Sequence, residues 1–215
     1  MPKLLDLFCG PGGAAAGYIA AGWEVTGVDL LPLAKWYPGR FVQADALTFP
    51  LEGFDAIHAS PPCQRWAGGA SWPRSQGHEY PDHLTPTLDR LALVGAPWVV
   101  ENVPNSPIRA QLLLCGSMFG LPVLRHRYFA ANWPMPLAPA DCCDGNNRFN
   151  VYDSGPRRKG TDRTFCDAMG VTWAPTSATF DGHRRKVALE AIPPAYTEFI
   201  GRALLAQLPA VAEVA

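Results

Sequence analysis

Cys63 lies in the segment ASPPCQRW, directly after two prolines, and its thiol is a candidate nucleophile. A thiol reacts as its thiolate, and because an ordinary cysteine has a pKa of about 8.5, a reactive cysteine needs a supporting environment. Pro61 and Pro62 fix φ in the chain before it, which suits the presentation of a side chain on a stiff loop. Most free cysteines are instead buried and inert, so neighbouring segments must decide between the two interpretations.

The pair Glu101-Asn102 ends the apolar run PWVVENV (97–103), and Cys63 follows the strand-like segment FDAIHAS (54–60). In an open α/β sheet the carboxyl ends of parallel strands line one edge, where ligands bind. The nucleophile and the carboxylate are therefore predicted to share that edge. Residues 64–83, rich in glycine and proline, form a predicted loop after Cys63 that could close over a substrate. These features favour a reactive Cys63.

A glycine cluster, FCGPGG (8–13), separates the strand-like segment KLLDLF from a small-residue helix. Glycines let the backbone approach a ligand closely, and a helix N-terminus offers free N–H groups. Asp29, at the end of the next predicted strand, could accept hydrogen bonds from ribose hydroxyls, and Asp45 from an adenine amino group. Dinucleotide enzymes and methyltransferases that use S-adenosylmethionine share this pattern, and a purely packing role is the alternative. The candidate cofactor-binding residues are Phe8, Gly10, Gly12, Gly13, Asp29 and Asp45.

Strand-like and helix-like patterns alternate through the first half of the chain. Strands are expected at residues 3–8, 24–30, 41–45, 54–60 and 97–103, and helices at 14–23, from about Leu84, and at 194–208. Such alternation predicts βαβ units with a parallel sheet. Residues 132–182 are rich in Pro, Gly, Asn and Asp and show little periodicity. We therefore expect a main domain of residues 1–131 plus 183–215, with 132–182 as a small, irregular insertion.

Length and composition indicate one domain. The 215 residues, 48% of them hydrophobic, can bury a core without metal or disulfide staples, and no apolar run is long enough to cross a bilayer. No signal peptide is expected from the first residues, and the six cysteines suggest reduced thiols in a cytoplasm. The net charge of −1 hides an uneven distribution, since residues 125–186 hold ten Lys/Arg against six Asp/Glu. Any contact with a polyanion is expected there.

No metal site is expected from the spacing of the potential ligands. Cys142 and Cys143 are adjacent, whereas paired ligands of a structural zinc usually have two or more residues between them, so Cys166 and His183 do not complete a recognisable pattern. The His and acidic residues at 78–83 are interpreted as a solvated loop.

Five motifs, taken together and in order, resemble those of the cytosine-C5 DNA methyltransferase family: DLFCGPGG, ASPPCQ, ENV, RHR and AIPP. The family's Phe-x-Gly-x-Gly is matched by Phe8, Gly10 and Gly12, its Pro-Cys by Pro62-Cys63, and its Glu-Asn-Val begins at Glu101. The resemblance spans residues 4 to about 208, with the middle of the insertion unmatched. It implies a mostly parallel Rossmann-like methyltransferase sheet with helices on both faces, and S-adenosylmethionine as cofactor.

The resemblance also implies a mechanism. The Cys63 thiolate would add to C6 of cytosine, the acid at Glu101 would hydrogen-bond to N3 and the exocyclic amine, and the activated C5 would take the methyl group. The base would be flipped out of duplex DNA. Arg125 and Arg127 would hold the target phosphate and the base O2, unless RHR is a solvated edge strand. The catalytic candidates are Cys63, Glu101, Arg125 and Arg127. The substrate-binding candidates are Pro62, Gln64, Asn102, Arg148, Arg157 and Arg158.

The chain departs from the family pattern in three places. Val123 replaces a usual glutamine, and Leu189-Glu190 replaces Gly-Asn before the final AIPP. The resemblance implies that residues 1–131 plus 183–215 form the catalytic domain and that 132–182 form a target-recognition insertion, which is short for the family. Alternatives therefore stay open: the same chemistry on single-stranded nucleic acid or free cytidine nucleotide, or an inactive binder. A nicotinamide-dependent oxidoreductase would leave Cys63 and ENV unexplained. We expect a cytoplasmic monomer, in a bacterium or a virus-infected host, that acts on duplex DNA, with a cognate restriction nuclease as a candidate partner.

Overall fold

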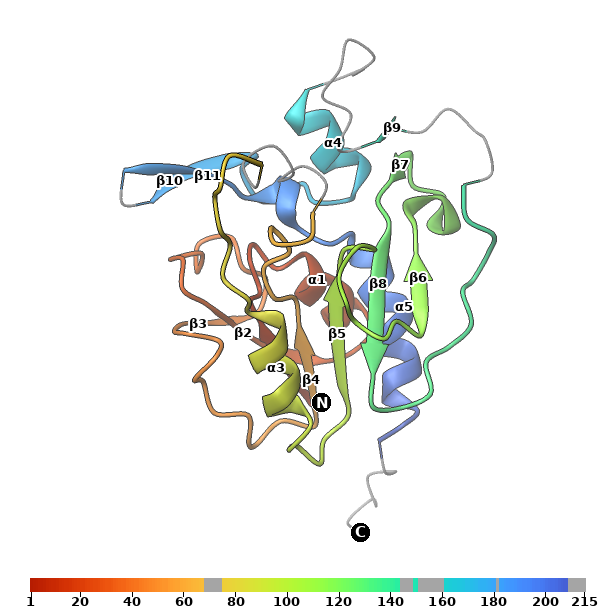
Figure 1. Ribbon diagram of the computed structural model, residues 1–215. Helices are drawn as coiled ribbons and strands as arrows, with labels where there is room; N and C mark the ends of the chain where they lie inside the picture. The colour runs from red at the N-terminus through yellow and green to blue at the C-terminus, as the bar shows by residue number, and fades with distance from the viewer. Residues whose placement is uncertain (68–74, 144–148, 151–160, 181, 209–215) are drawn as a thin grey trace.

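The computed structural model describes residues 1–67, 75–143, 149–150, 161–180 and 182–208 (Figure 1). The first half contains β1 (Lys3–Leu7), α1 (Gly13–Ala20), β2 (Glu24–Asp29), β3 (Arg40–Gln43), β4 (Ala56–Ala59), α3 (Leu84–Leu91) and β5 (Trp98–Asn102). The second half contains β6 (Leu112–Leu114), η2 (Gly116–Phe119), β7 (Val123–Leu124), β8 (Arg127–Ala131), β9 (Phe149–Asn150), α4 (Asp162–Ala168), β10 (Ser177–Phe180), β11 (His183–Lys186), η3 (Ala188–Glu190) and α5 (Pro194–Leu205).

Seven strands form one sheet in the order β3-β2-β1-β4-β5-β8-β6. The first five are joined by parallel pairings, with Leu5 opposite both Thr26 of β2 and Ile57 of β4. β8 pairs antiparallel with both β5 and β6. The prediction of an α/β fold with a mostly parallel sheet is confirmed. The reversed β8 matters for the site, because it places its first residue, Arg127, near the carboxyl end of β5.

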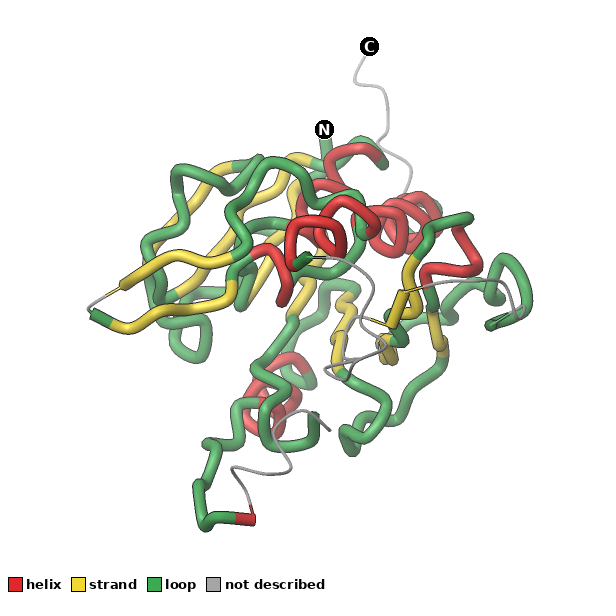
Figure 2. The backbone as a smooth tube through the Cα atoms, turned by 90° about the horizontal axis from the view of Figure 1, so that it is seen from above, coloured by secondary structure: helices red, strands yellow, loops and turns green. Residues whose placement is uncertain are grey.

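Helices cover both faces of the sheet (Figure 2). Alternation along β1 explains why: Leu4 points into a core shared with α1 and α5, whereas Leu5 and Leu7 point into a second core shared with α3. Burial on both faces is typical of parallel sheets, and it accounts for the apolar runs seen in the sequence.

α1 and α5 pack closely because small residues line their contact. A Cβ on Gly17 would lie 2.1 Å from the carbonyl oxygen of Pro194, so only glycine fits. Two hydrogen bonds fix the pair: the Thr197 hydroxyl donates to the carbonyl of Ala14 (2.8 Å), and the Trp23 indole N–H donates to that of Gly201 (3.1 Å). The carboxyl-terminal helix therefore supports the helix that follows the glycine cluster.

A third core lies beneath the insertion. It joins Cys166, Met169 and Val171, in and after α4, to Leu33, which follows β2, and to Ala188 of η3. Residues of the insertion therefore pack against the body that carries the seven-stranded sheet rather than standing apart from it.

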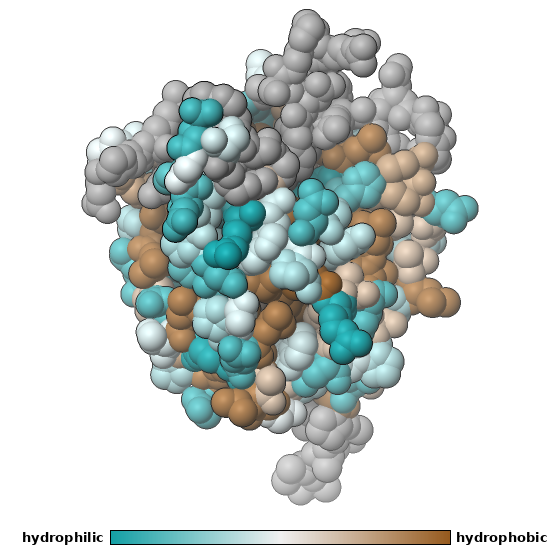
Figure 3. All heavy atoms as spheres, viewed as in Figure 1, coloured by the Kyte–Doolittle hydropathy of each residue, from teal (hydrophilic) through white to brown (hydrophobic). Residues whose placement is uncertain are grey.

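The helix expected from about Leu84 is α3, which begins at that residue. α3 stops at Leu91, and Leu93 is 88% exposed, so Leu93 does not join the buried face. Hydrophilic and hydrophobic residues are interspersed on the face shown in Figure 3, and the large exposed apolar side chains are scattered singly. Within the described part of the chain, no helix combines the length and the apolar character needed to cross a membrane.

Candidate active site

Cys63 lies on a loop four residues after the end of β4, and several hydrogen bonds hold that loop. The Asn102 side-chain amide donates to the carbonyl of Pro61 (3.0 Å), linking the end of β5 to the prolines. After Cys63, the backbone N–H groups of Trp66 and Ala67 both donate to the Cys63 carbonyl (2.9 Å each). Cys63 is half-buried, so its thiol is neither sealed in the core nor freely solvated.

Burial raises the pKa of the Cys63 thiol, with Arg127 opposing the rise and Glu101 adding to it. These causes show that the thiol, the carboxylate and the guanidinium share one electrostatic environment. The thiol is therefore predominantly protonated at neutral pH in the protein alone.

Glu101 and Arg127 form a buried ion pair. Arg127 Nε lies 2.7 Å from Glu101 Oε1, with side-chain exposures of 5% and 8%. The pairing of β5 with β8, which sets Asn102 opposite Tyr128, brings the two side chains together. Burial raises the pKa of Glu101, while Arg127 and then Arg125 counteract that rise. Burial is therefore the dominant influence on this carboxyl group, even with two guanidinium groups opposing it.

Arg125 is also buried, so the RHR segment is not a solvated edge strand. Arg125 itself lies between β7 and β8 rather than within a strand. Its Nη2 donates to the carbonyl of Glu190 (3.0 Å). The Tyr196 hydroxyl donates to the Arg125 carbonyl (2.6 Å). Arg125 therefore links the carboxyl-terminal segment to the surroundings of Glu101.

A buried polar chain leads to Glu101 from the opposite side. The Tyr18 hydroxyl lies 3.1 Å from His58 Nδ1, His58 Nε2 lies 2.9 Å from the Ser60 hydroxyl, and Ser60 hydrogen-bonds to the Glu101 carboxylate. Burial lowers the pKa of His58 to about 3, so the imidazole is neutral. A consistent assignment has each hydroxyl or N–H donating toward Glu101. Sequence reasoning missed His58 and Ser60, although a histidine inside the apolar run FDAIHAS was a visible signal.

The glycine cluster contains residues with two different roles. Phe8 (φ 56°), Gly10 (φ 51°) and Gly12 (φ 84°) all have left-handed backbone, which is uncommon for Phe8. A Cβ on Gly12 would lie 2.3 Å from Pro38 Cδ, and one on Gly13 would lie 2.3 Å from the carbonyl oxygen of Ile192. A Cβ on Gly10 would meet nothing within 4 Å. Gly12 and Gly13 therefore serve close packing, while Gly10 faces open space.

Of the two candidate cofactor carboxylates, Asp29 contacts this cluster, and Asp45 follows the neighbouring strand β3. Asp29, at the end of β2, accepts from the backbone N–H groups of Gly10 (3.0 Å) and Leu31 (2.9 Å). Burial raises the pKa of Asp29, and these N–H groups counteract the rise. Asp45 accepts from the backbone N–H of Leu47 (2.9 Å). Each carboxylate oxygen has a second lone pair, so both acids retain acceptor capacity for a ligand.

The remaining predicted site residues fall into two groups. Pro62 and Gln64 flank Cys63 and are half-buried, and Asn102 positions the loop as described. Arg148, Arg157 and Arg158 lie outside the described residues. A contact that sequence reasoning missed comes from the insertion: the Trp173 indole N–H donates to the carbonyl of Pro11 (3.0 Å) inside the glycine cluster.

The sheet resembles those of solved methyltransferases, although the chain matches no family model and no curated protein. The structure of Spodoptera frugiperda DNMT2 (a mutant form) matches with a TM-score of 0.50 at 18% identity, over 78% of this chain and 65% of that one. The chain therefore has a methyltransferase fold. Entamoeba histolytica EhMeth (TM-score 0.47, 13% identity, 66% and 57% covered) and S. pombe Dnmt2 (0.43, 18%, 60% and 48%) are more distant matches. The chain thus spans less than two thirds of the length of each of these structures.

Proposed function

We propose that the protein is an S-adenosylmethionine-dependent methyltransferase that methylates C5 of cytosine in DNA. The observation that carries this proposal is the convergence of Cys63 with the buried Glu101–Arg127 pair at the carboxyl edge of β4 and β5. An inactive binder has no need of a nucleophile beside a buried acid. The methyltransferase fold and the motif resemblance support the same conclusion.

The described residues fit the proposed cofactor. Gly10 faces open space three residues after β1, Asp29 ends β2, and Asp45 lies two residues after β3. Both carboxylates have acceptor capacity left. Gly10 and the start of α1 would approach the amino acid part, Asp29 the ribose and Asp45 the adenine. When bound, S-adenosylmethionine supplies an electrophilic methyl group.

Cys63 begins the reaction. Its thiol loses a proton and Sγ forms a bond to C6, which places the electron pair of the C5–C6 double bond on C5. Glu101 donates a hydrogen bond to N3 and stabilises the charge that develops in the ring, while Arg127 holds the carboxyl group in place. C5 takes the methyl group with this electron pair, which leaves the cofactor as its neutral thioether, S-adenosylhomocysteine. Solvent water accepts the C5 proton, as it accepted the thiol proton. The electron pair of the C5–H bond then restores the C5–C6 double bond, and the Sγ–C6 bond breaks to release the thiolate. Arg125 contributes positive charge for the target phosphate or O2.

The substrate assignment rests on the resemblance and on the excess of basic residues between 125 and 186. Duplex DNA would require the target cytosine to be flipped out, at a cost on the order of a few kcal/mol. The short insertion favours a second candidate, single-stranded nucleic acid or free cytidine nucleotide, because it offers little chain for gripping a duplex. A cytoplasmic monomer, with a cognate nuclease as a candidate partner, is part of the same proposal.

The test measures transfer of labelled methyl from S-adenosylmethionine to duplex DNA, single-stranded DNA and cytidine nucleotides. We expect label in duplex DNA with the unchanged chain and none with Cys63→Ala. Cys166→Ala, which removes a thiol in α4 instead, serves as the matched control and should keep its activity. Label found only in cytidine nucleotides would show that the substrate is a free nucleotide and not DNA, while the proposed methylation chemistry would stand.

A substrate containing 5-fluorocytosine tests the covalent step itself. Fluorine at C5 prevents the final loss of a proton, so the Sγ–C6 bond should persist and a stable adduct should map to Cys63. Binding of S-adenosylmethionine without label or adduct on any substrate would reject the catalytic proposal.

A further inference from the structure

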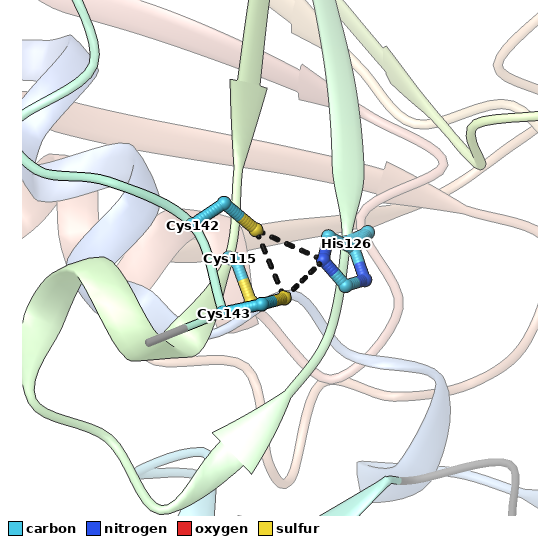
Figure 4. Close-up of side chains that lie close together, drawn as sticks. All are labelled: Cys115, His126, Cys142 and Cys143. Atoms are coloured by element: carbon cyan, nitrogen blue, oxygen red, sulfur yellow. Dashed lines mark hydrogen bonds between the residues drawn. The ribbon is translucent and has the colours of Figure 1, made fainter. Parts of the chain in front are cut away.

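Four side chains of the types that bind metal ions converge at residues 125–127, called here the arginine segment (Figure 4). They are Cys115, His126, Cys142 and Cys143, and their ligand atoms all lie within 4.8 Å of one another. Cys115 directly follows β6, His126 lies between β7 and β8, and the two adjacent cysteines belong to the segment after β8. Residues far apart in the sequence are therefore brought to one point by the fold.

The distances within this cluster are short. His126 Nε2 lies 3.1 Å from both Cys142 Sγ and Cys143 Sγ, and these two sulfur atoms are themselves 3.1 Å apart. Cys115 is fully buried beneath them and hydrogen-bonds to Cys142. All of these cysteines are free thiols, since a disulfide would need the sulfur atoms at about 2.05 Å.

We propose that these four residues bind a structural zinc ion. Three sulfurs and one imidazole nitrogen form a ligand set that Zn²⁺ favours, and four protein ligands leave no open position for catalysis. With metal–sulfur distances of about 2.3 Å, tetrahedral ligand atoms lie roughly 3.7 Å apart. The three separations of 3.1 Å among His126, Cys142 and Cys143 therefore need to widen by about half an ångström, while all ligand atoms already lie within 4.8 Å of one another. On binding, three thiols release their protons to solvent, zinc–sulfur bonds form, and no electrons are exchanged.

The backbone explains how adjacent cysteines can share one ion. Cys143 has a left-handed backbone (φ 59°), which is uncommon for a residue with a side chain, and its N–H donates to the Ser117 hydroxyl (3.1 Å). This turn directs both sulfurs toward His126. Spacing along the chain offered Cys166 and His183 as the further metal ligands beside Cys142 and Cys143. Cys166 lies in the core beneath α4, and the fold brings Cys115 and His126 to the two cysteines instead.

The charge around the cluster also suits the bound ion. A zinc ion with three thiolates and a neutral imidazole carries a net charge of −1, and His126 lies between Arg125 and Arg127 in the chain. The backbone N–H of Arg125 also hydrogen-bonds to Cys115. Zinc would therefore tie the arginine segment to β6 and to the start of the insertion. This site is independent of the proposed methyl transfer.

The test determines the metal content of the whole chain, purified without a metal-binding tag, by elemental analysis. We expect one zinc per chain, and replacement by Co²⁺ should give the thiolate charge-transfer and d–d bands of a tetrahedral site. Cys142→Ser, Cys143→Ser and His126→Gln should each lose most of the zinc. Cys63→Ser and Cys166→Ser, which remove thiols outside the cluster, are the matched controls and should retain it.

X-ray absorption of zinc in the unchanged chain keeps the test decisive if a variant fails to fold. Three sulfur and one nitrogen neighbours are expected. Zinc held without sulfur, zinc retained by all three cluster variants, or no uptake of zinc or cobalt would overturn the proposal. So would a peptide containing a Cys142–Cys143 disulfide in freshly purified protein.

Discussion

Arg127 Nε lies 2.7 Å from Glu101 Oε1, and this ion pair is almost completely shielded from solvent. It joins the end of a parallel strand to the start of the antiparallel strand beside it. The polar chain from Tyr18 through His58 and Ser60 reaches the same carboxylate from the other side. Glu101 is thus positioned by both neighbouring strands, β4 and β8.

Removing Arg127 should destabilise the protein. Arg127→Ala leaves a buried carboxylate without its partner, a change that typically costs about 3–5 kcal/mol. The pKa of Glu101, already raised by burial, should rise further, so the stability loss should be larger at pH 8 than at pH 5. Urea unfolding at the two pH values measures this. Arg202→Ala, which breaks the exposed pair with Glu198 in α5, is the control and should change stability by less than about 1 kcal/mol.

Glu101→Gln keeps the shape of the side chain but removes its proton-donating acid. We expect methyl transfer to fall by about 10²–10⁴-fold, the usual contribution of a positioned acid. Cofactor binding should be nearly unchanged, because Glu101 is not among the residues proposed to hold it. Single-turnover kinetics with titration calorimetry separates the two effects. Equal losses of binding and rate would indicate a structural role instead.

The reactivity of Cys63 should increase with pH. Because burial raises the pKa of its thiol, the thiolate fraction in the folded protein at pH 7 is smaller than in an unfolded chain. Alkylation by iodoacetamide should therefore be slower in the folded state and accelerate across pH 8–10, as followed by mass spectrometry of the Cys63 peptide. The same cysteine in urea-unfolded protein is the reference. Faster alkylation of the folded form at pH 7 would contradict this prediction.

Gly10 and Gly13 should respond differently to alanine. A Cβ at Gly13 would lie 2.3 Å from the carbonyl oxygen of Ile192, so Gly13→Ala must displace backbone and should lower stability by several kcal/mol. Gly10→Ala meets no neighbour and suffers only the cost of its left-handed backbone, about 1–2 kcal/mol. Denaturant unfolding compares them. Of the two, Gly10→Ala should be the variant that stays folded and weakens binding of S-adenosylmethionine.

Asp6 should make the protein less stable as the pH rises. Burial raises its pKa from 3.8 to about 7, with the Tyr37 hydroxyl opposing the rise. The folded state then keeps a proton that the unfolded state has lost between about pH 4 and pH 7, so the free energy of unfolding decreases over that interval. Asp6→Asn should remove this dependence and be more stable at pH 8, by an amount on the order of 4 kcal/mol, since one pKa unit corresponds to about 1.4 kcal/mol. A flat wild-type profile from pH 4 to 8 would disprove it.

The sequence by itself determined the α/β class, the positions of the main strands and the carboxyl-edge placement of Cys63 and Glu101. These follow from local patterns: apolar runs, glycine turns and the rule that parallel strands end at one edge. It also drew attention to RHR and to the glycine cluster.

Only the tertiary structure decided which distant groups meet. The reversal of β8 placed Arg127 against Glu101, and the pairing of β4 with β5 placed Ser60 beside the same carboxylate. Close packing against Pro38 and Ile192 made glycine necessary at positions 12 and 13. Likewise, Cys142 and Cys143 met Cys115 and His126, which no spacing along the chain indicated. Local patterns encode the elements, whereas contacts between residues tens of positions apart depend on strand order and direction, and these arise only when the whole core packs.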